Sequence, residues 1–193
     1  MGEVLEGKVR RAVQEAGQRE VGVEALFALT FLLFLVGAAL GVLLHGEAPK
    51  VFQETWWRPL RHPSPLLPED PVAHLAYAFT VILPKNLEVL LVGSVALPWI
   101  GRVLLGEPWP ARVYLLALGF ATGLMATPGG LPHGGAYFLG ALPVAAVEFL
   151  AYATGAARGV RAAKENRFPD LILPVGLLAL GSLLETEIIA WWL

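Results

Sequence analysis

Residues 141–155 read ALPVAAVEFLAYATG, an almost wholly apolar stretch with one carboxylate, Glu148, near its centre. No Lys or Arg lies within one or two helical turns of Glu148 on the same segment. An ionisable group at mid-depth in a bilayer costs a few kcal/mol or more unless it finds a partner. The sequence therefore predicts that Glu148 points at another helix, at a water-filled cavity or at a binding site.

The composition indicates what surrounds this stretch. The 193 residues have a mean hydropathy of +0.62, with 56% hydrophobic and 16% charged residues. A soluble domain usually carries about 25% charged residues. The charges gather in residues 1–24, 45–70, 101–112 and 158–170, and apolar runs of about 20 residues lie between them. This pattern is typical of a polytopic α-helical membrane protein. A soluble helical bundle would need polar residues at every third or fourth position.

We expect an all-α fold with about five transmembrane helices and one interfacial or re-entrant half-helix. The expected spans are residues 25–44, 87–99, 111–125, 136–157 and 169–192, and the half-helix is 72–81. Pro84 lacks a backbone N–H and disfavours helix at Leu83, so we expect a break at 84–86 and no crossing by 72–83. Broken backbone at membrane depth must be satisfied by protein or water, which places the break against other helices or a cavity.

The basic residues predict the orientation. Three basic regions fall on one side of a five-span chain, namely the leader and the loops after the second and fourth spans. Their members are Lys8, Arg10, Arg11, Arg19, Arg102, Arg112, Arg158, Arg161, Lys164 and Arg167. The positive-inside rule then puts the N-terminus in the cytoplasm and the C-terminus outside the cell membrane.

The same pattern divides the chain into two parts. Residues 1–24 form a cytoplasmic leader whose amphipathic helix, 3–20, lies on the membrane or on the bundle, or docks a cytoplasmic partner. Residues 25–193 form a single transmembrane domain. Its proline-rich loop, 45–70, is expected outside the cell membrane, with its adjacent tryptophans at the headgroup level.

Several polar residues fall within the expected spans or the break. They are Lys85, Asn86, Glu88, Glu148, Glu185 and Glu187. Lys85 and Glu88 are spaced to pair locally on a helix, and Asn86 could cap the helix after the break. Glu148 and Glu185 have no local partner, so we expect them to bond to Asn86, to Lys85 or to backbone amides at the break. These groups either hold the bundle together or line a path for a proton, an ion or a substrate. A catalytic role is the third interpretation.

The sequence favours a non-enzymatic protein with no catalytic residue, cofactor or metal site. The chain has no cysteine, which excludes disulfides and thiolate metal sites. Its four histidines are scattered, and the common hydrolase and nucleotide-binding motifs are missing. Ser94 and Ser182 lie inside spans, where a hydroxyl usually bonds to its own helix backbone. Glycine pairs at 37/41, 119/123 and 155/159 could allow close helix contacts.

Three segments resemble motifs of the stage II sporulation protein M family. Residues 82–89, ILPKNLEV, resemble that family's break of two asparagines followed by apolar residues. Residues 142–151, LPVAAVEFLA, with the glycine-rich 155–159 after them, resemble its Leu-Pro-His-Gly-x-x-Glu-x-x-Ala motif. Residues 183–188, LLETEI, resemble its terminal Ile-Glu helix. Chain length, five spans and the basic leader also fit.

This chain departs from the family's pattern at three positions. Val144 and Ala145 stand where the family has His-Gly, and Lys85 stands where it often has the first Asn. The His-Gly pair is therefore missing at these two positions. Asn86, Glu148 and Glu185 match the family's polar positions.

The resemblance implies a membrane scaffold that recruits peptidoglycan-remodelling or other envelope partners. The partners we expect are the lipid bilayer and other membrane or envelope proteins, without nucleic acid, and a homo-oligomer is left open. The alternative is a small transporter, channel or permease-like subunit with a site near Glu148 and the break at 84–86, because transporters build midplane sites from broken helices and buried acids.

Overall fold

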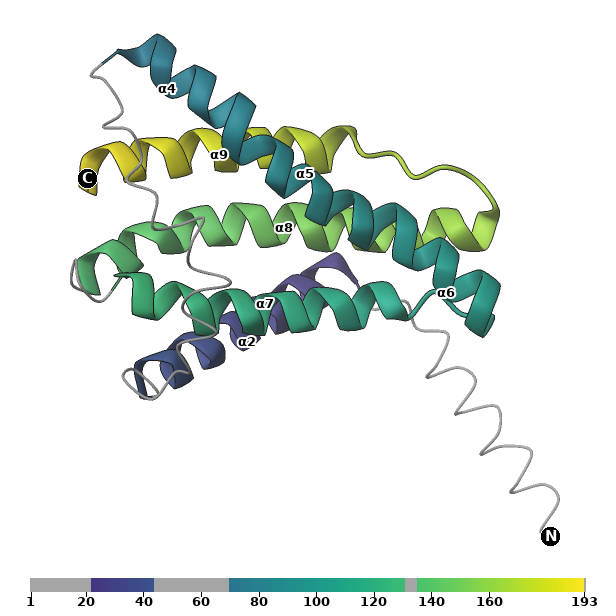
Figure 1. Ribbon diagram of the computed structural model, residues 1–193. Coiled ribbons are helices and arrows are strands. Elements are labelled where there is room, and N and C mark those ends of the chain that lie inside the picture. The colour runs from purple at the N-terminus through teal and green to yellow at the C-terminus, as the bar shows by residue number, and fades with distance from the viewer. Residues whose placement is uncertain (1–21, 44–69, 131–134, 193) are drawn as a thin grey trace, which may run out of the picture.

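The computed structural model describes residues 22–43, 70–130 and 135–192, and every regular element within them is helical. The elements are α2 (Val23–Leu43), α4 (Pro71–Tyr77), η1 (Ala78–Ile82), α5 (Leu83–Leu91), η2 (Val92–Ala96), α6 (Leu97–Leu105), α7 (Pro110–Gly130), α8 (Gly135–Glu165) and α9 (Ile172–Trp192). The five elements from α4 to α6 form one continuous rod, which packs with the other four helices in a single bundle (Figure 1). The leader helix expected at 3–20 and the loop at 45–69 lie outside the described residues.

The all-α membrane architecture expected from the sequence is confirmed. Helices long and apolar enough to cross a membrane cover Val23–Gly41, Pro71–Leu105 and Gly140–Glu165. Pro110–Leu124 is a shorter apolar helix. In Figure 1 the last four rods run in alternating directions, so the ends of α6 and α8 lie at the same end of the bundle as the starts of α7 and α9.

The expected break at Pro84 is wrong, and so is the separate half-helix at 72–81. The chain is helical without interruption from Pro71 to Leu105, and this rod includes the second span expected at 87–99. Asp70 caps the rod at its start, because its Oδ1 accepts a hydrogen bond from the backbone N–H of Val72 at 2.9 Å. Residues 72–83 therefore belong to a 35-residue helix that is long enough to cross a membrane.

Two π-helical turns explain why this rod tolerates its prolines. Pro84 and Pro98 each follow such a turn and lie in the first positions of α5 and α6. In η1 and η2 the backbone hydrogen bonds span five residues instead of four. In η1, for example, the N–H of Leu83 donates to the carbonyl of Ala78. A proline ring inside an ordinary α-helix clashes with the carbonyl four residues earlier. The extra residue in each π-turn relieves this clash, so the rod continues through both prolines.

Glycines bring α2 and α7 into direct backbone contact. A Cβ atom built on Gly119 would lie 2.5 Å from the carbonyl oxygen of Thr30, and one built on Gly123 would overlap the carbonyl of Phe34. Gly37 on α2 makes the reciprocal contact with the backbone of α7. The spacing at 119/123 therefore serves a close helix contact, as small-residue motifs do in membrane helices.

The pair at 155/159 serves the same purpose between α8 and η2. A Cβ atom on Gly159 would overlap the carbonyl oxygen of Ser94, and one on Gly155 would lie 2.5 Å from Leu90 Cδ1. Phe149 and Tyr152, also on α8, are buried in the hydrophobic core. Phe149 packs edge-on against Phe34 of α2, with ring centroids 5.4 Å apart. Helix α8 therefore lies between α2 and the long rod.

The basic residues that follow the second and fourth expected spans lie at one end of the bundle, and those of the leader lie outside the described residues. The guanidinium of Arg102, in α6, donates to the carbonyl of Ala163 near the end of α8. It also lies 3.4 Å from Asn166 Oδ1. Arg158 pairs with Asp170 at 2.9 Å, which ties α8 to the turn before α9. The ends of α6 and α8 are thus joined by charge-assisted hydrogen bonds.

Candidate functional site

Glu148 lies in α8 and points at the long rod. The side-chain amide of Asn86, on α5, donates a hydrogen bond to Glu148 Oε1 at 2.5 Å, and both side chains are half-buried. The sequence predicted that Glu148 would meet the residues after Pro84, and this contact is present. The contact comes from a continuous helix and not from a break. Helix α5 follows the π-turn η1 and carries Asn86 on the side that faces α8.

Helix α9 closes the other side of Glu148. A Cβ atom built on Gly181 would lie 3.1 Å from Glu148 Cγ and 3.8 Å from its Oε1, so the acid packs over a glycine. Glu185 lies one helical turn after Gly181 on the same face and interacts electrostatically with Glu148. Lys85 in turn interacts electrostatically with Glu185. We call Lys85, Asn86, Glu148 and Glu185 the polar cluster.

The polar cluster contains two carboxyl groups, one amide and one ammonium group from three helices, and the hydrogen bond from Asn86 to Glu148 joins two of them. Asn86 and Lys85 come from α5, Glu148 from α8 and Glu185 from α9. Such a set can tie the helices together by hydrogen bonds and charge. It also has the groups that accept a proton or attract a cation, because two carboxyl groups share one region.

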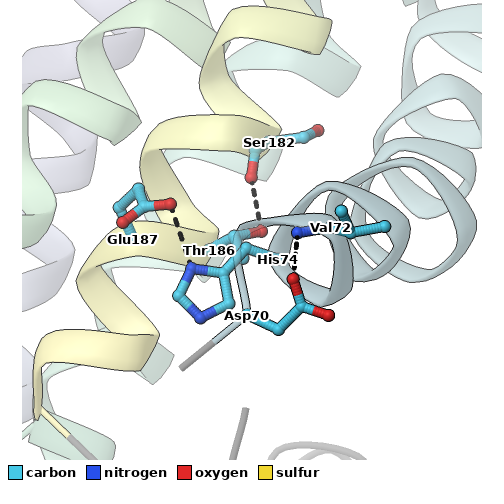
Figure 2. Close-up of polar contacts among 6 residues, drawn as sticks. All are labelled: Asp70, Val72, His74, Ser182, Thr186 and Glu187. Atoms are coloured by element: carbon cyan, nitrogen blue, oxygen red, sulfur yellow. Dashed lines mark hydrogen bonds and ion pairs between the residues drawn. The ribbon is translucent and has the colours of Figure 1, made fainter. Parts of the chain in front are cut away.

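Glu88 and Glu187 do not join the polar cluster. Glu88 is exposed on α5, and no ion pair joins it to Lys85 in the part of the chain that the structure describes. Glu187 has a side chain that is 67% exposed and accepts a hydrogen bond from His74 Nδ1 at 3.1 Å (Figure 2). The sequence grouped both acids with Glu148 and Glu185, but side-chain direction around each helix separates them.

His74 ties the start of α4 to the last turns of α9. Its Nε2 is buried and has no hydrogen-bond partner among the described residues. Figure 2 shows the ring between the two helices, close to the capping residue Asp70. Sequence reasoning treated His74 as one of four scattered histidines. Its partner lies 113 residues away, so no local pattern could have revealed the contact.

The two serines inside helices behave differently from one another. Ser182 Oγ donates to the carbonyl of Leu178 at 2.9 Å, as the sequence predicted for both serines. The carbonyl of Ser182 in turn accepts from Thr186 Oγ1 at 2.8 Å (Figure 2). Ser94 Oγ is buried and has no partner within the described ranges. Ser94 lies in the π-turn η2, where the backbone hydrogen bonds are shifted from the ordinary α-helical pattern. This shift could not be foreseen from the sequence.

The described residues contain no group of three His, Asp or Glu side chains that could hold a metal ion. The polar cluster offers carboxyl, amide and ammonium groups. Comparison of the chain with protein-family models, with curated proteins and with solved structures found no match.

Proposed function

We propose that this protein is a non-enzymatic integral membrane component of a cell-envelope complex, in which the polar cluster holds the bundle in shape. One observation carries the proposal. Glu148 is held by Asn86 on one side and packs over Gly181 on the other, so the acid is engaged by two neighbouring helices. A carboxyl group used in this way replaces costly exposure to lipid with contacts between helices.

One small cavity lies between the long rod, α7 and α8. This cavity measures about 10 Å³ and is lined mainly by apolar side chains of α5, η2, α7 and α8. The carboxyl groups of the polar cluster are not among its lining residues. Pockets that bind drug-sized ligands usually measure about 300–1,000 Å³.

The envelope role rests on the resemblance to the stage II sporulation protein M family and on the proposed orientation. With the basic end in the cytoplasm, the end of α2 and the start of α4 face the outside of the cell membrane. A partner that remodels peptidoglycan works on that side. The proposal therefore assigns recruitment to the extracytoplasmic end and stability to the polar cluster.

Crosslinking in the native membrane tests this function. A tagged chain is crosslinked in intact cells, purified in detergent and analysed by mass spectrometry. The proposal predicts enrichment of envelope-remodelling proteins over a tagged membrane protein of unrelated function. Deletion of residues 45–69 should remove that enrichment while the shortened chain remains in the membrane. Equal recovery with both baits would contradict the scaffold role.

A proton-conducting role is the second candidate, and the geometry of the long rod favours it. Two carboxyl groups, Glu148 and Glu185, lie within electrostatic reach of one another beside a rod that contains two π-turns. Such turns are frequent at functional sites, and acids within membrane helices often mark proton paths.

Reconstitution separates the two functions. Purified protein in liposomes that contain a pH-sensitive dye is given a pH gradient. A scaffold predicts the same rate of dye response as empty liposomes. A proton path predicts a faster response that Glu148→Gln abolishes and that Glu88→Gln, on the exposed side of α5, leaves intact.

A further inference from the structure

Two charged residues lie on the exposed side of α5. At about 100° per residue, five exposed positions fall within one arc of about 120° around this helix. We call them the outer face of α5, and they are Pro84, Lys85, Glu88 and Leu91, with Val92 at the start of η2. Leu90, on the opposite side of the helix, is buried. The rod packs on α8 and α9 and crosses in front of them in Figure 1, and its outer face points away from the bundle.

Both charges lie near the middle of the bilayer. Asn86 donates to Glu148, so α5 and α8 are at the same depth at this point. Glu148 lies ten residues before Arg158, which is about 15 Å along the helix. Arg158 pairs with Asp170 at the basic end of the bundle. Since the hydrocarbon core is about 30 Å thick, Glu88, two residues after Asn86, lies at about half its depth.

Glu88 needs a partner that its own copy does not provide. In the part of the chain that the structure describes, Glu88 forms no ion pair and no side-chain hydrogen bond. A long lysine side chain can extend towards the membrane surface, but a glutamate at mid-depth is too short to do so. Acids within membrane helices almost always face protein or water, because exposure to lipid is costly. The outer face of α5 is therefore a contact surface for protein.

We propose that the outer face of α5 binds a second copy of the chain, with Lys85 of each copy paired to Glu88 of the other. The face is complementary to itself, because it carries opposite charges three residues apart. A two-fold axis along the membrane normal brings Lys85 beside Glu88 of the other copy in both directions. The offset between the two positions is about 4.5 Å along the helix, which the flexible lysine stem can span.

The neighbouring side chains also favour contact between two copies. Leu91 and Val92 are 47% and 39% exposed and lie beside the charges. In a bilayer, apolar contact gives helices little preference for one another over lipid, so polar pairs decide which faces meet. A different membrane protein would need a matched acid and base at the same depth, whereas a second copy has both. This inference does not depend on the scaffold role.

Exchange of the charges tests the pairing. Two copies with different tags are expressed together, extracted in a mild detergent and purified through one tag, and the recovery of the other tag is measured. Glu88→Lys and Lys85→Glu each place like charges opposite one another, so each alone should recover at least about tenfold less of the second tag than the parent. A Glu88→Lys copy expressed with a Lys85→Glu copy restores both pairs, and its recovery should return to that of the parent.

Glu107→Lys is the matched control, because it makes the same change of charge at an exposed position outside the rod. Its recovery of the second tag should equal that of the parent. A parent chain that recovers no second tag would overturn the proposal and assign the outer face of α5 to a different protein. Mixed variants that recover no more than either variant alone would also overturn it.

Glu88→Gln separates association from folding, because it removes the charge and keeps the shape. The recovery of the second tag should fall about tenfold. The melting temperature of the chain dispersed in excess detergent should not change, because the pairs form between copies. A recovery equal to that of the parent would overturn the proposal. A melting temperature several degrees below that of the parent would overturn it too, because Glu88 would then act within one copy.

Discussion

Replacement of Gly119 by alanine should force α2 and α7 apart. A Cβ atom at this position would lie 2.5 Å from the carbonyl oxygen of Thr30 and 2.8 Å from its Cγ2. Ordinary contact begins at 3.4 Å, so the methyl group would be 0.9 Å too close to backbone. Thr30 is fully buried, and its Oγ1 is bonded to the carbonyl of Leu26 at 2.7 Å. The neighbour therefore cannot rotate away, and the helices must separate.

The magnitude follows from the cost of overpacking and the gain in helix propensity. Extra methyl groups in a packed core cost about 1–3 kcal/mol. Alanine in place of glycine within a helix gains about 0.8–1.0 kcal/mol. Gly176→Ala makes that gain without the clash. The difference between Gly119→Ala and Gly176→Ala should therefore be about 1–3 kcal/mol, with Gly176→Ala the more stable variant.

Thermal unfolding in detergent measures this difference. At about 2–4 °C per kcal/mol for a chain of this size, Gly119→Ala should melt about 2–12 °C below Gly176→Ala. Gly123→Ala, which would overlap the carbonyl of Phe34, should lower the melting temperature at least as much. Equal melting temperatures for Gly119→Ala and Gly176→Ala would refute the close contact between α2 and α7.

Two further predictions concern the basic end of the bundle. Arg102→Ala should lower the free energy of unfolding by about 1–3 kcal/mol, because the carbonyl of Ala163 loses a charged hydrogen-bond donor. Chemical denaturation in detergent measures this change, and an unchanged denaturation midpoint would argue against the bond. For the orientation, single cysteines at positions 64 and 164 are treated with an impermeant thiol reagent in intact cells. A cytoplasmic basic end predicts labelling at 64 and protection at 164, and the reverse pattern would contradict it.

The helical class and the main apolar segments could be predicted from composition and charge spacing alone. The first expected span, 25–44, is close to α2, and the fourth, 136–157, lies inside α8. Helix α8 ends at Glu165, where Asn166 has a positive φ of 58° and the N–H of Arg167 donates to the carbonyl of Ala162 at 2.9 Å. An asparagine followed closely by a proline, as in residues 166–169, is a local signal for such a helix end, so this boundary was open to prediction from the sequence.

The prediction failed at Pro84 because single-residue rules describe ordinary α-helices. A proline removes one backbone N–H, and its ring clashes with the carbonyl four residues earlier. In this chain the π-turns η1 and η2 precede the prolines, and the helix continues without a break. The contact between Asn86 and Glu148 could still be anticipated, because a carboxyl group in an apolar helix needs a partner. The unpartnered hydroxyl of Ser94 could not be anticipated, because it depends on the position of the π-turn η2.

Glu148 gives the most direct test of the claim that the polar cluster holds the bundle together. Glu148→Ala leaves the Asn86 amide without its acceptor, and Glu148→Gln keeps an oxygen in the same place. The account predicts that alanine lowers the free energy of unfolding by about 1–3 kcal/mol in detergent. Glutamine, and the exposed control Glu88→Ala, should leave the free energy of unfolding near that of the parent. A Glu148→Ala variant as stable as the parent would contradict the account.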